Sequence, residues 1–302
     1  MELDISKISL PVFEALASET RLKLIQFIGG EKKSIGEIAK YLGISNAITT
    51  RHVRQLEDAG LLNSERGIGE NRNKKLVFLN VDDIHISFPE KVYKGLNLHT
   101  TNLKIGHFTD FSVTPTCGLA TKTEIIGKTD DPKFFMDTLR VDAALVWLSE
   151  GYLEYKIPNL LRENETPEMM EFIFEIASEF PISNNVWPSD ITIYVNGIKV
   201  AVYTVPGNFS DVRGRYTPAW WDSYLSQYGL LKHLRINKLD TAIDGEVYSA
   251  VKINELGLEN ETFITLRFAV EVDAKNKGGM TLFGEGFGNY NQDIIVNTYY
   301  SV

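Results

Sequence analysis

The most constraining feature of the sequence is a short helix pattern with clear start and stop signals between residues 34 and 43. Ser34 and Glu37 have the spacing of a capping box, which satisfies free N–H groups at the start of a helix. Gly43 is the residue type that commonly ends a helix. The apolar residues between these signals recur at helical spacing: Ile35, Ile38, Ala39 and Leu42.

A second helix pattern follows at once. Ser45 can cap it, and Gly60 ends it. Two helices joined by so short a glycine turn predict a helix-turn-helix geometry. In the second helix we expect three residues to face inward: Ile48, Val53 and Leu56.

Further elements flank this pair. Ser9 and Ser18 can cap two earlier helices. After the pair, residues 61–66 and 74–80 predict two strands joined by a loop rich in turn residues. A hairpin placed directly after the second helix is a wing.

Several spaced motifs of this region resemble a known family. They are Phe13-Glu14-Ala15-Leu16-Ala17-Ser18-Glu19-Thr20-Arg21-Leu22, Leu42-Gly43-Ile44-Ser45, Thr50-Arg51-His52-Val53, Leu56 and Ala59-Gly60-Leu61-Leu62. Over about residues 9–80 they resemble the winged helix-turn-helix of ArsR-type transcriptional regulators. The resemblance implies a double-stranded DNA operator, a homodimer and repression, although the dimerisation helix usual after the wing is not visible. The alternative is a unit of the same shape without DNA contact, because winged helices also serve as protein-interaction modules.

The second helix and the wing supply the candidate DNA contacts. N-terminal residues of such a helix meet base edges in the major groove. There Asn46 can pair with adenine, and Arg51 with guanine or a phosphate. Wing cations suit the DNA backbone or the minor groove. The alternative for each charged residue is a solvated surface position. The predicted DNA-binding set is Ser45, Asn46, Thr49, Thr50, Arg51, His52, Arg54, Arg66, Arg72 and Lys74.

Metal sensing, which is common in this family, is not expected here. The helix over 34–42 lacks the Cys pair that some members carry, and His85, His99 and His107 lack Cys or carboxylate partners at ligand spacing. We therefore expect no metal and no other cofactor. Cys117 is the only cysteine, so it forms no intramolecular disulfide, and we expect it to pack as a small buried hydrophobe.

Charge and aromatic residues divide the 302-residue chain in two. Residues 1–80 carry a net charge of +2 and residues 81–302 a net charge of −11. The overall charge of −9 therefore does not argue against a locally basic DNA-binding face. All four Trp residues lie beyond residue 140. We predict a DNA-binding domain over 1–85, a linker over 86–100 and a ligand-binding domain over 101–302.

Beyond about residue 103 the apolar period changes from helical to alternating. Nine strands are predicted, over 103–114, 141–147, 151–157, 170–177, 190–195, 199–205, 230–237, 263–271 and 293–300. Asn196-Gly197 predicts a type I′ turn between two of them. The predicted fold class is α+β multidomain: an N-terminal winged helix-turn-helix and a C-terminal antiparallel β-sandwich of jelly-roll-like form.

Five blocks of this part resemble ArsR-like regulators that carry such a C-terminal β domain: 113–120, 187–191, 213–221, 227–232 and 283–293. In outline the domain is similar to carbohydrate-binding jelly rolls. Aromatic rings beside planar polar side chains suit a small polar ligand, for which a carbohydrate is one candidate. The alternative for one of two adjacent Trp residues is the core, because neighbours on a regular element point in different directions. The predicted ligand-binding set is Trp220, Trp221, Arg213, Arg215, Tyr216, Gln227, Tyr228, Gln292 and Asp293.

Enzymatic function is not favoured. Only 14 residues follow the Gly284-x-Gly286-x-Gly288 run, which leaves no room for a dinucleotide-binding unit. Neither a catalytic triad nor a glycosidase carboxylate pair can be nominated from spacing. No apolar run reaches the ~18 residues of a membrane helix, and the N-terminus lacks the layout of a signal peptide. We therefore expect a cytoplasmic regulator without a membrane partner. The alternatives are a DNA-tethered sugar-modifying enzyme and a β domain that docks another protein.

Overall fold

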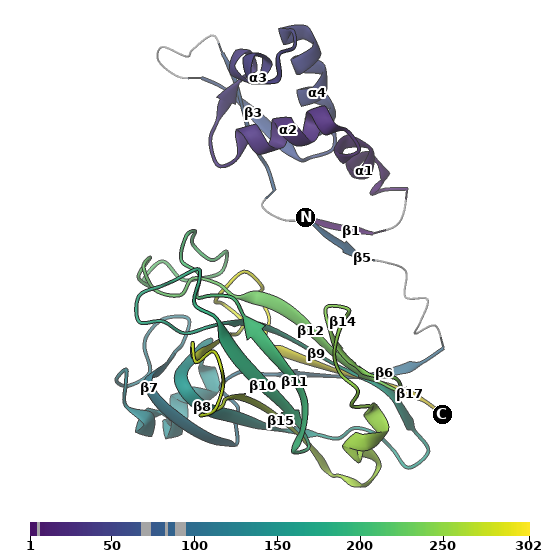
Figure 1. Cartoon of the computed structure of the whole chain (residues 1–302), viewed down its shortest axis with the longest axis vertical. Helices are drawn as coiled ribbons and strands as arrows, with labels where there is room; N and C mark the ends of the chain where they lie inside the picture. Colours follow the sequence, from purple (N-terminus) through teal and green to yellow (C-terminus); the bar gives the residue numbers. More distant parts are fainter. Residues whose placement is uncertain (5–6, 68–73, 82–83, 88–94) are drawn as a thin grey trace. The chain divides into compact units, whose positions relative to one another are not determined.

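The computed structural model describes residues 1–4, 7–67, 74–81, 84–87 and 95–302. It divides into two compact units, Met1–Lys94 and Gly95–Val302, the first mainly helical and the second mainly built of strands (Figure 1). Part of the predicted linker, 88–94, lies outside the described residues. The first strand of the second unit begins at Asn97, inside the predicted linker 86–100.

Four helices form most of the first unit: α1 (Leu10–Leu16), α2 (Glu19–Ile28), α3 (Ile35–Leu42) and α4 (Asn46–Asp58). The predicted capping box opens α3, since the N–H of Glu37 donates to Ser34 Oγ at 3.4 Å and the N–H of Ser34 donates to the Glu37 carboxylate at 2.8 Å. Gly43 has a φ of 67°, a conformation that favours glycine, and ends α3. These local signals place α3 and α4 at the two sides of one tight turn.

A small antiparallel sheet completes the first unit, in the order β2 (Lys33–Ser34), β4 (Lys75–Leu79), β3 (Leu62–Arg66). Strands β3 and β4 are the predicted wing, and the tip of their loop, 68–73, lies outside the described residues. β1 (Glu2–Asp4) and β5 (His85–Ser87) form a separate parallel pair. The fully buried core includes Leu24, Ile38, Val53, Leu56 and Val77. The unit is a winged helix-turn-helix.

The second unit is one antiparallel sheet of 12 strands among the described residues. The strands are β6 (Asn97–Leu103), β7 (Asp110–Ala120), β8 (Leu145–Pro158), β9 (Thr166–Ala177), β10 (Ser189–Val195), β11 (Ile198–Val205), β12 (Leu230–Asn237), β13 (Thr241–Ile243), β14 (Glu246–Ser249), β15 (Phe263–Val270), β16 (Met280–Phe283) and β17 (Ile294–Ser301). Four short 3-10 helices lie between strands: Pro132–Met136, Thr138–Asp142, Ile253–Leu256 and Leu258–Asn260.

The sheet curls into two layers around one core. Strands β11, β10, β15, β8 and β7 pair in that order on one side, and β6, β17, β9, β12, β13 and β14 on the other. β16 joins the sides by pairing with both β8 and β9. At the opposite edge, Ser249 Oγ of β14 donates to the Val200 carbonyl of β11 at 2.6 Å, which brings the two ends of the sheet together. The antiparallel architecture agrees with the predicted sandwich, while the jelly-roll description stays a prediction.

The predicted strands miss β13, β14 and β16 and differ most from the observed boundaries in two places. The predicted strand 103–114 is interrupted, because β6 ends at Leu103 and β7 begins at Asp110. The predicted strands 141–147 and 151–157 are joined in β8, where Gly151 lies against β7; a Cβ on it would come within 1.9 Å of the Ser112 carbonyl oxygen. The predicted type I′ turn is confirmed, with φ of 49° at Asn196 and 76° at Gly197.

Candidate functional site

Helix α4 presents a polar ridge on the side away from its packed core. Ser45 caps the helix, its Oγ accepting the N–H of Ile48 at 3.3 Å. Asn46, Thr50 and Arg51 are exposed, and the Thr50 hydroxyl donates to the Asn46 carbonyl at 2.8 Å. The helix start therefore presents free N–H groups, an amide and a guanidinium on one accessible face. These groups can form hydrogen bonds with phosphates and base edges.

Two predicted orientations on α4 are wrong. Thr49, predicted to face outward toward DNA, is 0% exposed, and its hydroxyl donates to the Ser45 carbonyl at 3.0 Å. Ile48, predicted to face inward, is 49% exposed. The buried stripe is 49, 53 and 56, at i, i+4 and i+7, and residue 48 falls one position off that stripe.

His52 of the predicted DNA-binding set is partly buried between helices. Burial, followed by the nearby guanidinium groups of Arg21 and Arg51, lowers the pKa of His52 below its usual range. Within the described part of the chain, its Nδ1 is buried without a hydrogen-bond partner. A neutral, partly buried imidazole fits packing against the helix-turn-helix better than a charged phosphate contact.

The predicted cations Arg54, Arg66 and Lys74 have different surroundings, as does their neighbour Lys75. Arg66 and Lys74 are exposed, and neither forms an ion pair with any described residue. Arg54 lies 4.0 Å from Asp58 one turn along α4. Lys75 is bound by Glu57 at 2.8 Å. Arg72 lies outside the described residues.

The sequence comparisons agree with this geometry. Residues 16–65 match the helix-turn-helix domain family. An uncharacterized HTH-type transcriptional regulator of Methanocaldococcus jannaschii is 35% identical over 63 residues, which cover 21% of this chain and 66% of that protein. The chain thus spans just under two thirds of the length of this relative.

Solved structures also align with the helix-turn-helix unit. One is the homodimeric winged helix-turn-helix DNA-binding domain of a possible ArsR-family regulator from Mycobacterium bovis, with 18% identity and a TM-score of 0.22 over 24% of this chain and 64% of that one. Another is HlyU from Vibrio cholerae, with 22% identity and a TM-score of 0.22 over 24% of this chain and 76% of that one. The winged helix-turn-helix assignment itself rests on this chain's own helices and strands and on the sequence match.

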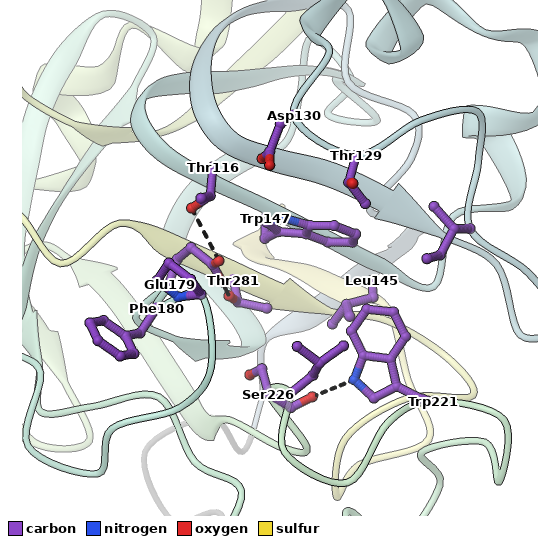
Figure 2. A pocket seen from close by; sticks show the side chains of 13 residues that line it. Thr116, Thr129, Asp130, Leu145, Trp147, Glu179, Phe180, Trp221, Ser226 and Thr281 are labelled. Atoms are coloured by element: carbon purple, nitrogen blue, oxygen red, sulfur yellow. Dashed lines mark hydrogen bonds between the residues drawn. The ribbon is translucent and has the colours of Figure 1, made fainter.

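The second unit contains a cavity of about 210 Å³ at one end of its sheet. Trp147 of β8 and Trp221 of the loop before β12 form an aromatic wall, their rings meeting edge to face at 5.8 Å. Glu179, two residues after β9, and Asp130, in the loop after β7, point into the same space (Figure 2). The pKa of Glu179 is raised to about 8, mainly by burial and also by the nearby charge of Asp130. The hydroxyls of Thr281 and Thr116 act in the opposite direction and lower this pKa.

Of the nine predicted ligand-binding residues, only Trp221 lines this cavity. It is buried, and its Nε1 donates to the Ser226 carbonyl at 2.9 Å. Trp220 points elsewhere, 38% exposed, and donates to the Lys122 carbonyl at 2.8 Å. The two adjacent indoles are perpendicular, as expected for neighbours of which one belongs to the core.

Two more of the predicted residues, Arg213 and Gln227, form hydrogen bonds within the loop before β12. Arg213 donates to the carbonyls of Pro218 and Trp221 at 2.7 and 3.3 Å. Gln227 is fully buried, and its Nε2 donates to the Asp222 and Leu225 carbonyls. These bonds hold the loop that carries Trp221, so the structure gives Arg213 and Gln227 a positioning role outside the cavity.

The other predicted residues line no common cavity. The Arg215 guanidinium lies over the Tyr216 ring, and the Tyr228 hydroxyl donates to Asp211 at 2.7 Å. Gln292 has a buried Nε2 without a partner in the described residues. Asp293 lines a second hollow of about 260 Å³ that also contains the ion-paired Lys104 and Lys122.

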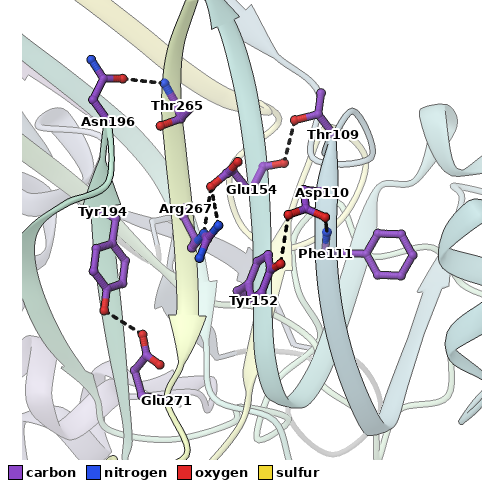
Figure 3. Close-up of polar contacts among 10 residues, drawn as sticks. All are labelled: Thr109, Asp110, Phe111, Tyr152, Glu154, Tyr194, Asn196, Thr265, Arg267 and Glu271. Carbon is purple, nitrogen blue, oxygen red and sulfur yellow. Dashed lines mark hydrogen bonds and ion pairs between the residues drawn. The ribbon is translucent and has the colours of Figure 1, made fainter.

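Carboxylates on the outer face of the sheet have partners (Figure 3). Glu154 of β8 pairs with Arg267 of β15 at 2.7 Å, and Asp110 of β7 accepts the Tyr152 hydroxyl at 2.9 Å. Leu153, between Tyr152 and Glu154, is buried in the core, which is the alternation of a sheet with one solvated face. This pairing contrasts with Glu179 and Asp130 in the cavity, which form no ion pair with a described residue.

Two further properties concern metals and membranes. Among the described residues, no group of three or more His, Cys, Asp or Glu side chains is arranged to hold a metal ion. Within the same residues, no helix is both long enough and apolar enough to cross a membrane.

Cys117 is buried, as predicted. Burial, followed by nearby acidic side chains, raises the pKa of its thiol to about 11. A thiol in that state is a poor nucleophile.

Proposed function

We propose that this chain is a DNA-binding transcriptional regulator whose helix α4 enters the major groove. One observation carries the proposal: Asn46 and Arg51 are exposed at the N-terminal half of a helix whose opposite side, at Val53, is completely buried. A helix held this way can enter a groove without unfolding its own support. The similarity to an HTH-type transcriptional regulator supports the same function.

The regulator acts in the cytoplasm as a homodimeric repressor on a pseudo-palindromic operator. Its β unit, with the proposed jelly-roll form, binds a small polar ligand, for which a carbohydrate is one candidate. The cavity beside Trp147 and Trp221 supports a ligand-binding role. A coupling of about 1–3 kcal/mol between ligand and DNA would change the DNA affinity about 5- to 150-fold.

A test of the DNA-binding proposal needs no operator sequence at the outset. Duplexes selected from a random pool by the full chain serve as probes in gel shifts at fixed salt. The double variant Asn46→Ala, Arg51→Ala is expected to lose at least about tenfold in affinity, because each lost base contact costs ~1–3 kcal/mol. Arg162→Ala, on the exposed surface of the β unit, is the matched control and is expected to bind like the wild type. Unchanged affinity of the double variant would remove α4 as the reading helix, and failure to select any duplex would remove the function.

A further inference from the structure

Two carboxyl groups, those of Glu179 and Asp130, line the cavity of the β unit. Among the described residues, no Lys, Arg or His lines it. Glu179 is half-buried and Asp130 is exposed, and the nearby charge of Asp130 contributes to the raised pKa of Glu179. A carboxylate withdrawn from water without a counter-charge is costly. The outer sheet face of the same unit avoids that cost by pairing Glu154 with Arg267.

Hydroxyl groups complete the polar side of the cavity. The Thr116 and Thr281 hydroxyls donate to the two oxygens of Glu179 at 3.3 and 3.1 Å, one to each oxygen (Figure 2). These contacts fix the orientation of the Glu179 carboxyl group, and the Thr281 hydroxyl also lies 3.1 Å from the Ser178 carbonyl. Ser226 lines the same cavity and is only 6% exposed, yet its Oγ has no hydrogen-bond partner among the described residues. A buried polar atom without a partner beside a cavity is a place where a water molecule or a ligand atom can supply the missing hydrogen bond.

The apolar side is aromatic. Trp147 and Trp221 form the wall described above, and Phe180 lines the cavity next to Glu179. The faces of such rings carry negative potential and attract organic cations, most strongly for Trp. An aromatic wall opposite unpaired carboxylates therefore suits a ligand that has a positive charge at one end and an apolar body at the other.

We propose that this cavity binds a small organic cation, with a protonated amine between Glu179 and Asp130 and its hydrocarbon or ring portion against Trp147 and Trp221. The inference rests on the proposed function, because it names the chemical class of ligand for the β unit. The cavity volume of about 210 Å³ is below the ~300–1,000 Å³ of pockets for drug-sized molecules, so the ligand is smaller than these. A neutral sugar is the competing occupant.

Calorimetric titrations of the full chain at neutral pH with three small molecules distinguish the effect of ligand charge from that of ligand shape. Cyclohexylamine and cyclohexanol share a ring, but only the amine carries a positive charge, and glucose is the neutral sugar. We expect cyclohexylamine to bind at least about tenfold more tightly than cyclohexanol, a difference of ~1.4 kcal/mol, and glucose to fail to displace it. Equal binding of cyclohexanol, tighter binding of glucose, or no binding of cyclohexylamine would each overturn the inference.

Two substitutions locate the amine. Asp130→Asn removes a charge, and Glu179→Gln removes a carboxyl group that has to ionise in order to pair with a bound amine. Both keep an oxygen acceptor, which Asp130 uses for the N–H of Cys117 at 3.0 Å. Each is expected to weaken cyclohexylamine about tenfold and leave cyclohexanol unchanged. Glu124→Gln makes the same charge change at an exposed position outside the cavity and is expected to bind like the wild type. Thermal unfolding followed by tryptophan fluorescence verifies that each variant folds. If Glu179→Gln does not fold, the result for Asp130→Asn alone tests the assignment. Equal weakening in Glu124→Gln, or none in the cavity variants, would contradict the assignment.

The DNA assay is kept separate from these titrations. A chain that binds selected DNA but not cyclohexylamine retains the proposed DNA-binding function and loses this inference. A chain that binds cyclohexylamine through Glu179 but selects no DNA retains the inference about the cavity and loses the regulatory function.

Discussion

Arg21 of α2 donates from Nη1 to the side-chain oxygen of Gln55 in α4 at 2.9 Å. Its Nε and Nη2 donate to the carbonyls of Ala15 and Glu14 at 2.6 and 2.7 Å. Those carbonyls belong to the last turn of α1, where helical partners are missing. One guanidinium therefore ties α1, α2 and α4 together.

Replacing Arg21 by Ala is expected to lower the free energy of unfolding of the helical unit by about 2 kcal/mol, because three charge-assisted hydrogen bonds are lost together. Far-ultraviolet circular dichroism follows the helical unit, and tryptophan fluorescence follows the β unit, since all four Trp residues lie there. Only the first transition should move to lower urea. Arg51→Ala, on the exposed face, is the control and should change stability by less than about 0.5 kcal/mol. A shift of both transitions would mean that Arg21 does not act within its own unit.

The wing cations should contribute to DNA affinity through phosphates. Arg66→Ala and Lys74→Ala are each expected to reduce the slope of log affinity against log salt by about 1, because each removes one phosphate contact. Lys75→Ala should leave the slope nearly unchanged, since Lys75 is already bound by Glu57 at 2.8 Å. Fluorescence anisotropy over a salt series measures the slopes. A larger effect of Lys75 than of Arg66 would contradict this assignment of the wing.

The β unit should lose stability as the pH rises. Burial raises the pKa of Glu175 to about 7 and that of Glu179 to about 8, whereas the ordinary value is 4.5. Between pH 4.5 and 8 the folded chain then binds more protons than the unfolded chain, so its free energy of unfolding falls with rising pH. Urea unfolding followed by tryptophan fluorescence across this window measures the slope. Glu179→Gln should reduce the fall in the free energy of unfolding in the upper part of this pH window, and Glu124→Gln should not. If Glu179→Gln leaves the pH dependence unchanged, Glu179 does not hold a buried proton in the folded chain.

Two glycines of positive φ should respond differently to the same substitution. Gly288 and Gly245 have φ of 75° and 88°, so Ala strains both backbones by roughly 1–2 kcal/mol. A Cβ at Gly288 would also come within 2.3 Å of Glu175 Oε1, whereas a Cβ at Gly245 meets nothing within 4 Å. Gly288→Ala should therefore cost about 1–3 kcal/mol more than Gly245→Ala in urea unfolding followed by tryptophan fluorescence. Equal costs would mean that the loop around Glu175 relaxes freely.

The helix-turn-helix could be predicted because its signals are local. The capping box of Ser34 and Glu37, the left-handed Gly43 and the cap at Ser45 act within a few residues of the backbone they shape. The directions in which the α4 side chains point were harder to predict from the sequence than the helix boundaries. Pattern reasoning put the apolar Ile48 inside, but the polar Thr49 is buried because its hydroxyl bonds to its own helix.

The cavity could be predicted only in part. Aromatic composition pointed to Trp221, which does line it. Glu179 and Asp130 carry no local signal, since acidic residues are abundant and these two come from loops after β9 and β7. They meet because β7 pairs with β8, and β16 joins β8 to β9, a long-range pairing that single-sequence periodicity does not encode. Sequence reasoning also missed Arg21, whose partners are backbone carbonyls.

The pairing of β6 with β17 places Asn97 opposite Tyr300, so the polypeptide enters and leaves the β unit as adjacent antiparallel neighbours. A unit whose two ends lie side by side can be inserted into a surface loop of a host protein without distorting the loop or the inserted unit.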